Sequence, residues 1–210
     1  RVAPDTQIPD VAMEDLQRQV VEATRTWGED LVDGARAEYG EEASSRLLAS
    51  WGNAFPEAYK EDFQARVGVA DLRHIEGLDD AGELRLNLYH APGSPAGERR
   101  LKLYRRGALS LTAILPIFTD MGLEVTDERP YELDAVDGST VHIYDFGLRA
   151  GSEEAWTRGT DGARQRFHEA FSAIWSGQAE SDGFNALVLS AGLDWRQVVI
   201  LRAVAKYQRQ

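Results

Sequence analysis

The chain has 210 residues, 43% of them apolar and 28% charged, which is the composition of a soluble globular protein with one large domain or two small ones. Its 35 acidic and 23 basic side chains give a net charge of −12, which disfavours binding to nucleic acid and to anionic membranes. The lack of cysteine excludes disulfides, thiolate metal sites and cysteine nucleophiles and agrees with a cytoplasmic location, and no apolar run could span a bilayer.

Residues 1–67 are predicted to form an N-terminal helical segment. Apolar side chains recur at helical spacing between a cap near Asp10 and a stop at Gly40, namely Leu16, Val20, Ala23, Trp27, Leu31, Ala35 and Tyr39. A second short helix follows and ends before Pro56. The first 62 residues carry 14 acidic and 6 basic side chains. We interpret them as a solvated helical face; the alternative is an acidic surface that docks on another domain.

Residues 68–178 are predicted to form an α+β domain, because the apolar period alternates between that of a helix and that of a strand. The expected elements are a helix that stops at Gly77, strands at 84–89 and 100–106, a helix at 110–121, strands at 123–133 and 139–149 joined at Asp137-Gly138, and a helix at 162–176. Ser110 is the expected helix cap, and Pro116 should kink its helix or delay the start to Thr112.

The order of these elements from residue 84 is a permutation of the ferredoxin-like order. We therefore expect a four-stranded antiparallel sheet with one face covered by the helices at 110–121 and 162–176. The other face is expected to be polar and to carry Arg85, Asn87, Tyr89, Arg100, Lys102, Tyr104 and Arg106. A sheet with such a face commonly packs on something else.

Residues 179–210 are predicted to form a C-terminal helical segment. Asp182 and Gly192 are the expected cap and stop of one helix, and Asp194 is the expected cap of another that runs toward Gln210. No stop signal precedes Gln210, and the chain begins at Arg1 without a signal peptide. We therefore expect it to be a piece of a longer protein.

No catalytic, cofactor-binding or metal-binding motif is present in the sequence. Dinucleotide-binding, Walker, zinc-protease and nucleophile-elbow patterns are all absent, and the four histidines are not paired at ligand spacing. Asp127 and Asp145 lie on neighbouring predicted strands and could form an acid–base pair, but an ordinary cross-strand ion pair with Arg129 is the favoured interpretation.

The run RRLKLYRR at 99–106 is the one basic patch in this acidic chain. With Tyr89 and Tyr104 it superficially resembles a base-stacking RNA-binding sheet, but the net charge argues against nucleic acid and no such motif is present. We favour an interdomain surface formed by Arg85, Arg100, Lys102 and Tyr104, whose basic groups pair with acidic groups such as those of the N-terminal helices. An anionic effector site is the remaining alternative.

Several long segments of the sequence resemble the large bacterial NAD-specific glutamate dehydrogenases. They are FPEAYKEDF (55–63), DLRHIEGL (71–78), LKLYRRG followed by LSLTAILPIFTDMGLEVTDERPYEL (101–133), VHIYDFGLR (141–149) and DGFNALVLSAGLDWRQVVILRAVAKYQRQ (182–210). The resemblance implies that the chain is the last ACT-like domain of the non-catalytic N-terminal part, with flanking helical segments. NAD and the oxidation of L-glutamate would then belong to the parent enzyme, and no catalytic or cofactor residue falls within this chain.

The resemblance also implies how the chain is used. Its partners would be other domains and subunits of a homo-oligomeric parent enzyme, and its role regulation and assembly. ACT domains often bind amino acids at a strand–helix loop, which here is the loop with Arg106 and Gly107 that leads to Ser110. A small amino-acid-sensing module and a pure oligomerisation module are the alternatives.

Overall fold

The computed structural model describes residues 25–79, 84–157 and 162–208. The predicted helix cap near Asp10 and the apolar positions Leu16, Val20 and Ala23 lie outside these residues. Among the helices of the described ranges, none is both long enough and apolar enough to cross a membrane.

The N-terminal helices are α2 (Trp27–Trp51), α3 (Glu57–Asp62) and α4 (Ala65–Glu76). Thr26 caps α2: its hydroxyl accepts from the Glu29 N–H, and the Glu29 carboxylate accepts from the Thr26 N–H at 2.8 Å. Gly40 has φ of 77° and breaks α2 into two helical parts, which confirms the predicted stop and the second helix after it.

The four strands form one antiparallel sheet, as predicted. They are β1 (Arg85–Tyr89), β2 (Glu98–Arg106), β3 (Leu123–Asp134) and β4 (Thr140–Ala150), in the order β1-β2-β4-β3. The β3–β4 hairpin turns at Asp137-Gly138, where Gly138 has φ of 82°, a value that favours glycine. Lys102 lies opposite Asp145 in the β2–β4 register, so their side chains share one face of the sheet.

One face of the sheet is covered by the two predicted helices, α5 (Leu111–Asp120) and α7 (Gly162–Trp175), with the short α6 (Glu154–Thr157) beside them. Phe118 of α5 and Phe171 of α7 pack with Leu101 and Phe146 of the sheet, and all four are fully buried. Helix α5 begins at Leu111, ahead of the predicted delayed start, and accommodates Pro116 in its interior.

One predicted cap and one predicted helix differ in detail, whereas the cap at Asp194 is confirmed. Ser110 occupies the N-cap position of α5, but its hydroxyl bonds the Thr112 hydroxyl at 2.8 Å instead of a backbone N–H. The single helix expected after Asp182 is a 3-10 turn, η1 (Gly183–Ala186), followed by one turn of α8 (Leu187–Ser190). Asp194 caps α9 (Trp195–Gln208) as predicted, because its carboxylate accepts from the Gln197 N–H at 2.9 Å.

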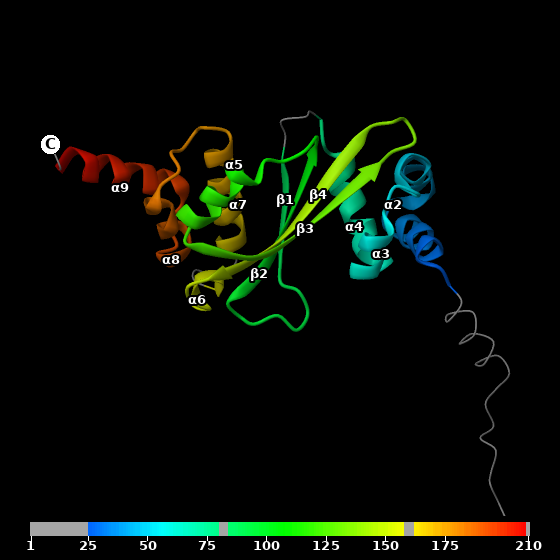
Figure 1. The fold of residues 1–210 in the computed structure, drawn as a ribbon, viewed down its shortest axis with the longest axis horizontal. Helices are drawn as coiled ribbons and strands as arrows, with labels where there is room; N and C mark the ends of the chain where they lie inside the picture. Colours follow the sequence, from blue (N-terminus) through cyan, green and yellow to red (C-terminus); the bar gives the residue numbers. More distant parts are fainter. Residues whose placement is uncertain (1–24, 80–83, 158–161, 209–210) are drawn as a thin grey trace, which may run out of the picture.

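The opposite face of the sheet carries the expected residues and is covered as well, because it packs on the N-terminal helices and does not stay open to solvent. Figure 1 shows α2, α3 and α4 on one side of the sheet and α5, α7 and α9 on the other. Lys102 and Tyr104 are only 1% and 0% exposed. The reason is a second apolar core, in which Leu72 and Ile75 of α4 pack with the sheet residues Tyr104, Tyr131, Leu133, Val141 and Ile143.

Candidate functional site

The candidate site is the covered polar face of the sheet, which we call the clamp face: Asn87 and Tyr89 of β1, Arg100, Lys102 and Tyr104 of β2, and Asp145 of β4, with Tyr59 of α3 and Asp71 of α4 above them. Strand side chains alternate between faces, so the spacing of two in β2 places its three residues together. The face combines carboxylates, cations and phenols in a largely buried setting.

Asp71 is the centre of a fully satisfied buried network. One of its carboxylate oxygens accepts from Lys102 Nζ and from the Tyr59 hydroxyl, both at 2.5 Å, and the other accepts from the Tyr104 hydroxyl at 2.7 Å. Lys102 Nζ also lies 3.7 Å from the centre of the Phe63 ring. The Asp71 and Lys102 side chains are each 1% exposed, so the pair is shielded from solvent screening.

The two phenols act as donors in this network. Burial, followed by the nearby Asp71 carboxylate, raises the pKa of Tyr59 and of Tyr104 well above the usual range. Both hydroxyls therefore stay protonated and stabilise the Asp71 carboxylate. Three donors around one carboxylate compensate for the desolvation that makes a bare buried ion pair unfavourable.

Arg100 organises a second cluster beside the first. Its guanidinium donates to Asp127 Oδ1 at 2.8 Å and to Asp145 Oδ2 at 3.0 Å, and Asp145 Oδ2 also accepts from the Tyr89 hydroxyl at 3.0 Å. The hydrogen bond from Arg100 lowers the pKa of Asp127. Burial raises the pKa of Asp145 in spite of the nearby cations Arg100 and Lys102. The other oxygen of Asp145 has no hydrogen-bond partner among the described residues.

A pocket of about 710 Å³ opens where α4 leaves part of the clamp face uncovered. Its floor includes Asn87, Tyr89, Arg100 and Asp145 of the sheet. Its walls come from α4, the end of α3 and the turn after β1, and include Phe63, Arg66, Val67, Ala70, Pro92 and Ser94. Such a mixture of an apolar wall and a few polar groups is typical of small-molecule sites.

The four predicted interdomain residues all lie on the side of the sheet that faces the N-terminal helices. Arg100, Lys102 and Tyr104 belong to the two clusters above. Arg85 lies against the end of α4, where its guanidinium carbon is 2.5 Å from the position of a Cβ at Gly77. The structure thus brings Arg100 and Lys102 together with acidic groups from both α4 and the sheet.

The predicted effector loop lies at the end of β2, outside the pocket. Gly107 has φ of 83°, and the Arg106 Nε donates to the Leu78 carbonyl at 3.2 Å. The Leu109 N–H donates to the Tyr144 hydroxyl at 2.9 Å, and Ser110 begins α5. Effector binding at Arg106, Gly107 and Ser110 stays a prediction.

Asp127 and Asp145, the two carboxylates suggested as an acid–base pair, were expected to form an ion pair with Arg129, but their shared partner is Arg100. Asp127 and Asp145 are bridged by Arg100, whereas Arg129 pairs with Asp62 of α3 at 3.2 Å and with Asp127 at 3.7 Å. A bulge near Val125 shifts the β3 register and moves Asp127 toward Arg100. Within the described ranges, no group of three or more histidine, aspartate and glutamate side chains could hold a metal ion.

Sequence reasoning missed Asp71 and Tyr59. The signal for Asp71 was its position in α4, three residues after Gly68 and four before Ile75, both of which are buried. A carboxylate within the apolar stripe of a helix must find donors, and the donors here are Lys102 and Tyr104 on another element. No local pattern identifies such a partner.

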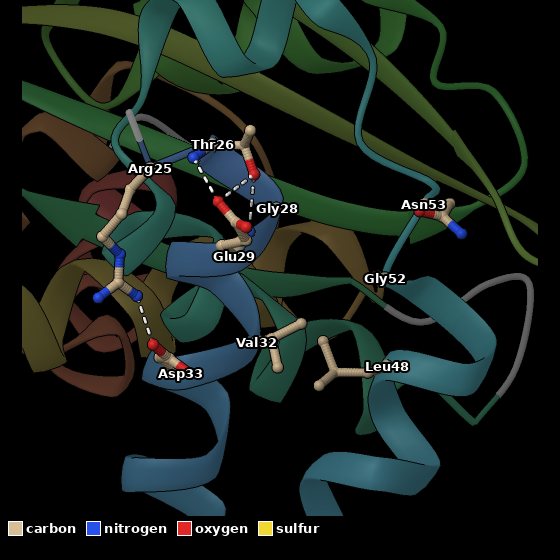
Figure 2. Close-up of a pocket in the computed structure, with 9 residues that line it drawn as sticks. All are labelled: Arg25, Thr26, Gly28, Glu29, Val32, Asp33, Leu48, Gly52 and Asn53. Atoms are coloured by element: carbon tan, nitrogen blue, oxygen red, sulfur yellow. Dashed lines mark hydrogen bonds and ion pairs between the residues drawn. The ribbon is translucent and has the colours of Figure 1, made fainter. Parts of the chain in front are cut away.

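A second pocket of about 670 Å³ lies between the two helical parts of α2 (Figure 2). Figure 2 shows that four of its polar side chains face one another in pairs: Thr26 and Glu29 form the helix cap, and Arg25 pairs with Asp33. Because these groups satisfy each other, this pocket is a weaker candidate than the one on the clamp face.

Comparison with known proteins gives three matching family models. They are glutamate dehydrogenase helical motif 2 over residues 36–78, the glutamate dehydrogenase ACT3 domain over residues 83–160, and glutamate dehydrogenase helical motif 3 over residues 179–210. Asp71 falls within the range of helical motif 2, and Lys102 within that of the ACT3 domain. The Asp71–Lys102 ion pair therefore joins two family domains.

Similar proteins carry one name in three bacteria. The NAD-specific glutamate dehydrogenase of Halomonas elongata is 40% identical over 196 residues, which are 93% of this chain and 12% of the relative. Those of Pseudomonas aeruginosa and Mycobacterium tuberculosis are each 34% identical, over 100% and 99% of this chain and 13% of each relative. The chain thus spans only 12% to 13% of the length of these relatives.

Proposed function

Because the chain belongs to the glutamate dehydrogenase family that carries the ACT3 domain and helical motifs 2 and 3, we propose that it is a regulatory and assembly segment of a large NAD-dependent enzyme. The parent enzyme would oxidise L-glutamate to 2-oxoglutarate and ammonia. NAD would bind in another part of that enzyme, and the partners of this segment would be other domains and subunits of a homo-oligomer.

The clamp face is the single observation that carries this proposal. It ties the helical-motif range to the ACT3 range through the buried Asp71–Lys102 pair and its two phenols. Such a joint fixes the orientation of one part against the other, which is what an assembly segment needs. A conformational change in the helical motif or in the ACT3 domain would alter the geometry at this joint and would thereby reach the other part.

The test has two arms. The purified chain, mixed with L-glutamate and NAD, is expected to produce no NADH. In the full-length enzyme, the variant Asp71→Leu is expected to change the oligomeric state or the dependence of rate on glutamate, whereas Glu76→Gln, at an exposed pair on the same helix, is expected to leave both unchanged. NADH production by the chain alone would refute the proposal, and so would an Asp71→Leu enzyme indistinguishable from the parent.

A further inference from the structure

Helix α9 carries most of the large apolar side chains that are exposed in the described part of the chain. Those on α9 are Val199, Ile200, Leu201, Val204 and Tyr207. Ile200, Val204 and Tyr207 follow one another at spacings of four and three residues, so they form one stripe along the helix, and they are 63%, 48% and 80% exposed. We call these three residues the apolar stripe. Contiguous exposed apolar surface of this kind marks a site of interaction with another protein.

The opposite side of α9 is fixed to its own chain. Val198 is buried, and the Arg202 guanidinium donates to Asp182 Oδ2 at 2.7 Å and to Asn185 Oδ1 at 2.7 Å. Val198 and Arg202 lie about half a helical turn away from the apolar stripe. These contacts therefore hold α9 in place with the apolar stripe turned outward.

The charge on α9 limits what can cover the stripe. The helix contains Arg196, Arg202 and Lys206 and no acidic residue, in a chain whose net charge is −12. Two α9 helices packed on each other would bring like charges together, which is unfavourable. The complementary surface should therefore be apolar at its floor and acidic at its rim.

The groove between the two helical parts of α2 has both properties. Figure 2 shows Val32 and Leu48 facing each other across it, and both side chains are half-buried. Helix α2 carries six acidic and two basic residues, and the acidic residues Glu29 and Asp33 line the groove. Gly28 lines it as well, and a Cβ at this position would meet no atom within 4 Å. A helix can therefore approach this side of the groove closely.

The apolar stripe and the groove lie at opposite ends of the molecule, since Figure 1 shows α9 at one end of the long axis and α2 at the other. Helix α9 therefore cannot reach the groove of its own chain. We propose that the apolar stripe of α9 docks into the α2 groove of a second copy of this chain. Apolar anchors at i, i+4 and i+7 are typical of a helix that binds in a groove.

The proposed contact is head to tail, because two different surfaces meet in it. Each chain that uses its stripe still has its groove, so the contact can repeat and produce a ring or an open filament. The inference rests on the proposed assembly role and deepens it, since it names the two surfaces. It does not depend on the Asp71–Lys102 pair, so each can fail without the other.

The experiment measures self-association of the purified chain by sedimentation velocity between about 5 and 500 µM. We expect species that grow with concentration. Ile200→Lys puts a charge in the stripe and Gly28→Arg places a charged side chain at the groove, so each should weaken self-association about tenfold or more. The matched controls are Leu111→Lys on α5 and Gly151→Arg after β4, two exposed positions outside both surfaces, and they should associate as the parent chain does.

A mixture of the two variants decides the geometry. Ile200→Lys keeps an intact groove and Gly28→Arg keeps an intact stripe, so an equimolar mixture should form heterodimers and nothing larger. Self-association of Gly28→Arg at the parent level would show pairing of stripe with stripe. A parent chain that stays monomeric at about 500 µM would show that another part of the enzyme covers the stripe, and association that appears only after deletion of residues 1–24 would assign the groove to those residues. Each of these three results would overturn the proposal and leave the clamp-face joint intact.

Discussion

Replacing Lys102 with methionine tests how much the buried network contributes to stability. Methionine keeps most of the length of the lysine stem but leaves the Asp71 carboxylate with two phenol donors and no counter-charge. Both side chains are 1% exposed, and Nζ lies 2.5 Å from Asp71 Oδ2. Removal of one partner from a buried pair costs about 3–5 kcal/mol, because the remaining charge stays desolvated.

The matched control is an exposed pair. Arg46 and Glu76 lie 3.2 Å apart with side chains 65% and 46% exposed, so Arg46→Met should cost less than about 1 kcal/mol. Urea unfolding followed by tryptophan fluorescence suits both variants, since Trp27 and Trp51 lie in or beside the core under the clamp face. If Lys102→Met costs no more than Arg46→Met, the Asp71 charge is not buried as the structure describes, and the argument for a clamp fails.

Three further predictions concern other parts of the molecule. Burial lowers the pKa of His168 to about 4 from 6.5, so stability should fall as pH drops from about 6.5 to 4, by about 2 kcal/mol after allowing for partial exposure. His168→Gln should reduce this dependence in acid titrations of the unfolding free energy, and burial of His74, which also lowers its pKa, should leave a smaller dependence of the same sign. Gly147→Ala places a Cβ 2.3 Å from Asp127 Oδ2, so the Asp127 carboxylate must move away from Arg100. The free energy of unfolding in urea should then fall by about 1–3 kcal/mol. It should fall far less for Gly97→Ala, whose Cβ would have no atom nearer than 3.8 Å. Thr26→Ala removes the cap of α2 and should cost about 1 kcal/mol in the same assay, a loss that Thr26→Ser should not show.

The sheet and its first layer of helices could be predicted because their signals are local. Alternation in 84–89 and 100–106, the Asp137-Gly138 turn and the helical period of 162–176 each determine an element without reference to the rest of the chain. The antiparallel sheet and the helices at α5 and α7 follow from these patterns. The exact form of short helices did not follow, since η1 and α8 differ from one helix only in a few hydrogen bonds.

The basic residues of the clamp face could be predicted from the sequence, but their partners could not. The basic run in β2 marked Arg100 and Lys102 as groups that need acidic partners, and the N-terminal helices were named as one source. That Asp71 of α4 is the partner depends on how two segments about 30 residues apart in sequence pack, as does the burial of Tyr104. That one oxygen of Asp145 accepts no hydrogen bond from the described residues was beyond prediction, because it depends on where Arg100 and Tyr89 direct their donors.

The contact between α4 and the sheet is made by a buried ion pair, and apolar side chains could also have held these two elements together. Apolar residues of similar volume are often as stable as a buried ion pair or more so, so the stability of the fold does not by itself explain Asp71 and Lys102. A carboxylate with three donors in fixed directions, however, tolerates only one placement of α4 on the sheet, whereas apolar contacts tolerate several. The double variant Asp71→Leu with Lys102→Met separates a role in stability from a role in orientation. If the double variant recovers the stability of the parent chain but the full-length enzyme assembles differently, the pair acts in orientation. If both the stability and the assembly are recovered, the pair is needed for neither.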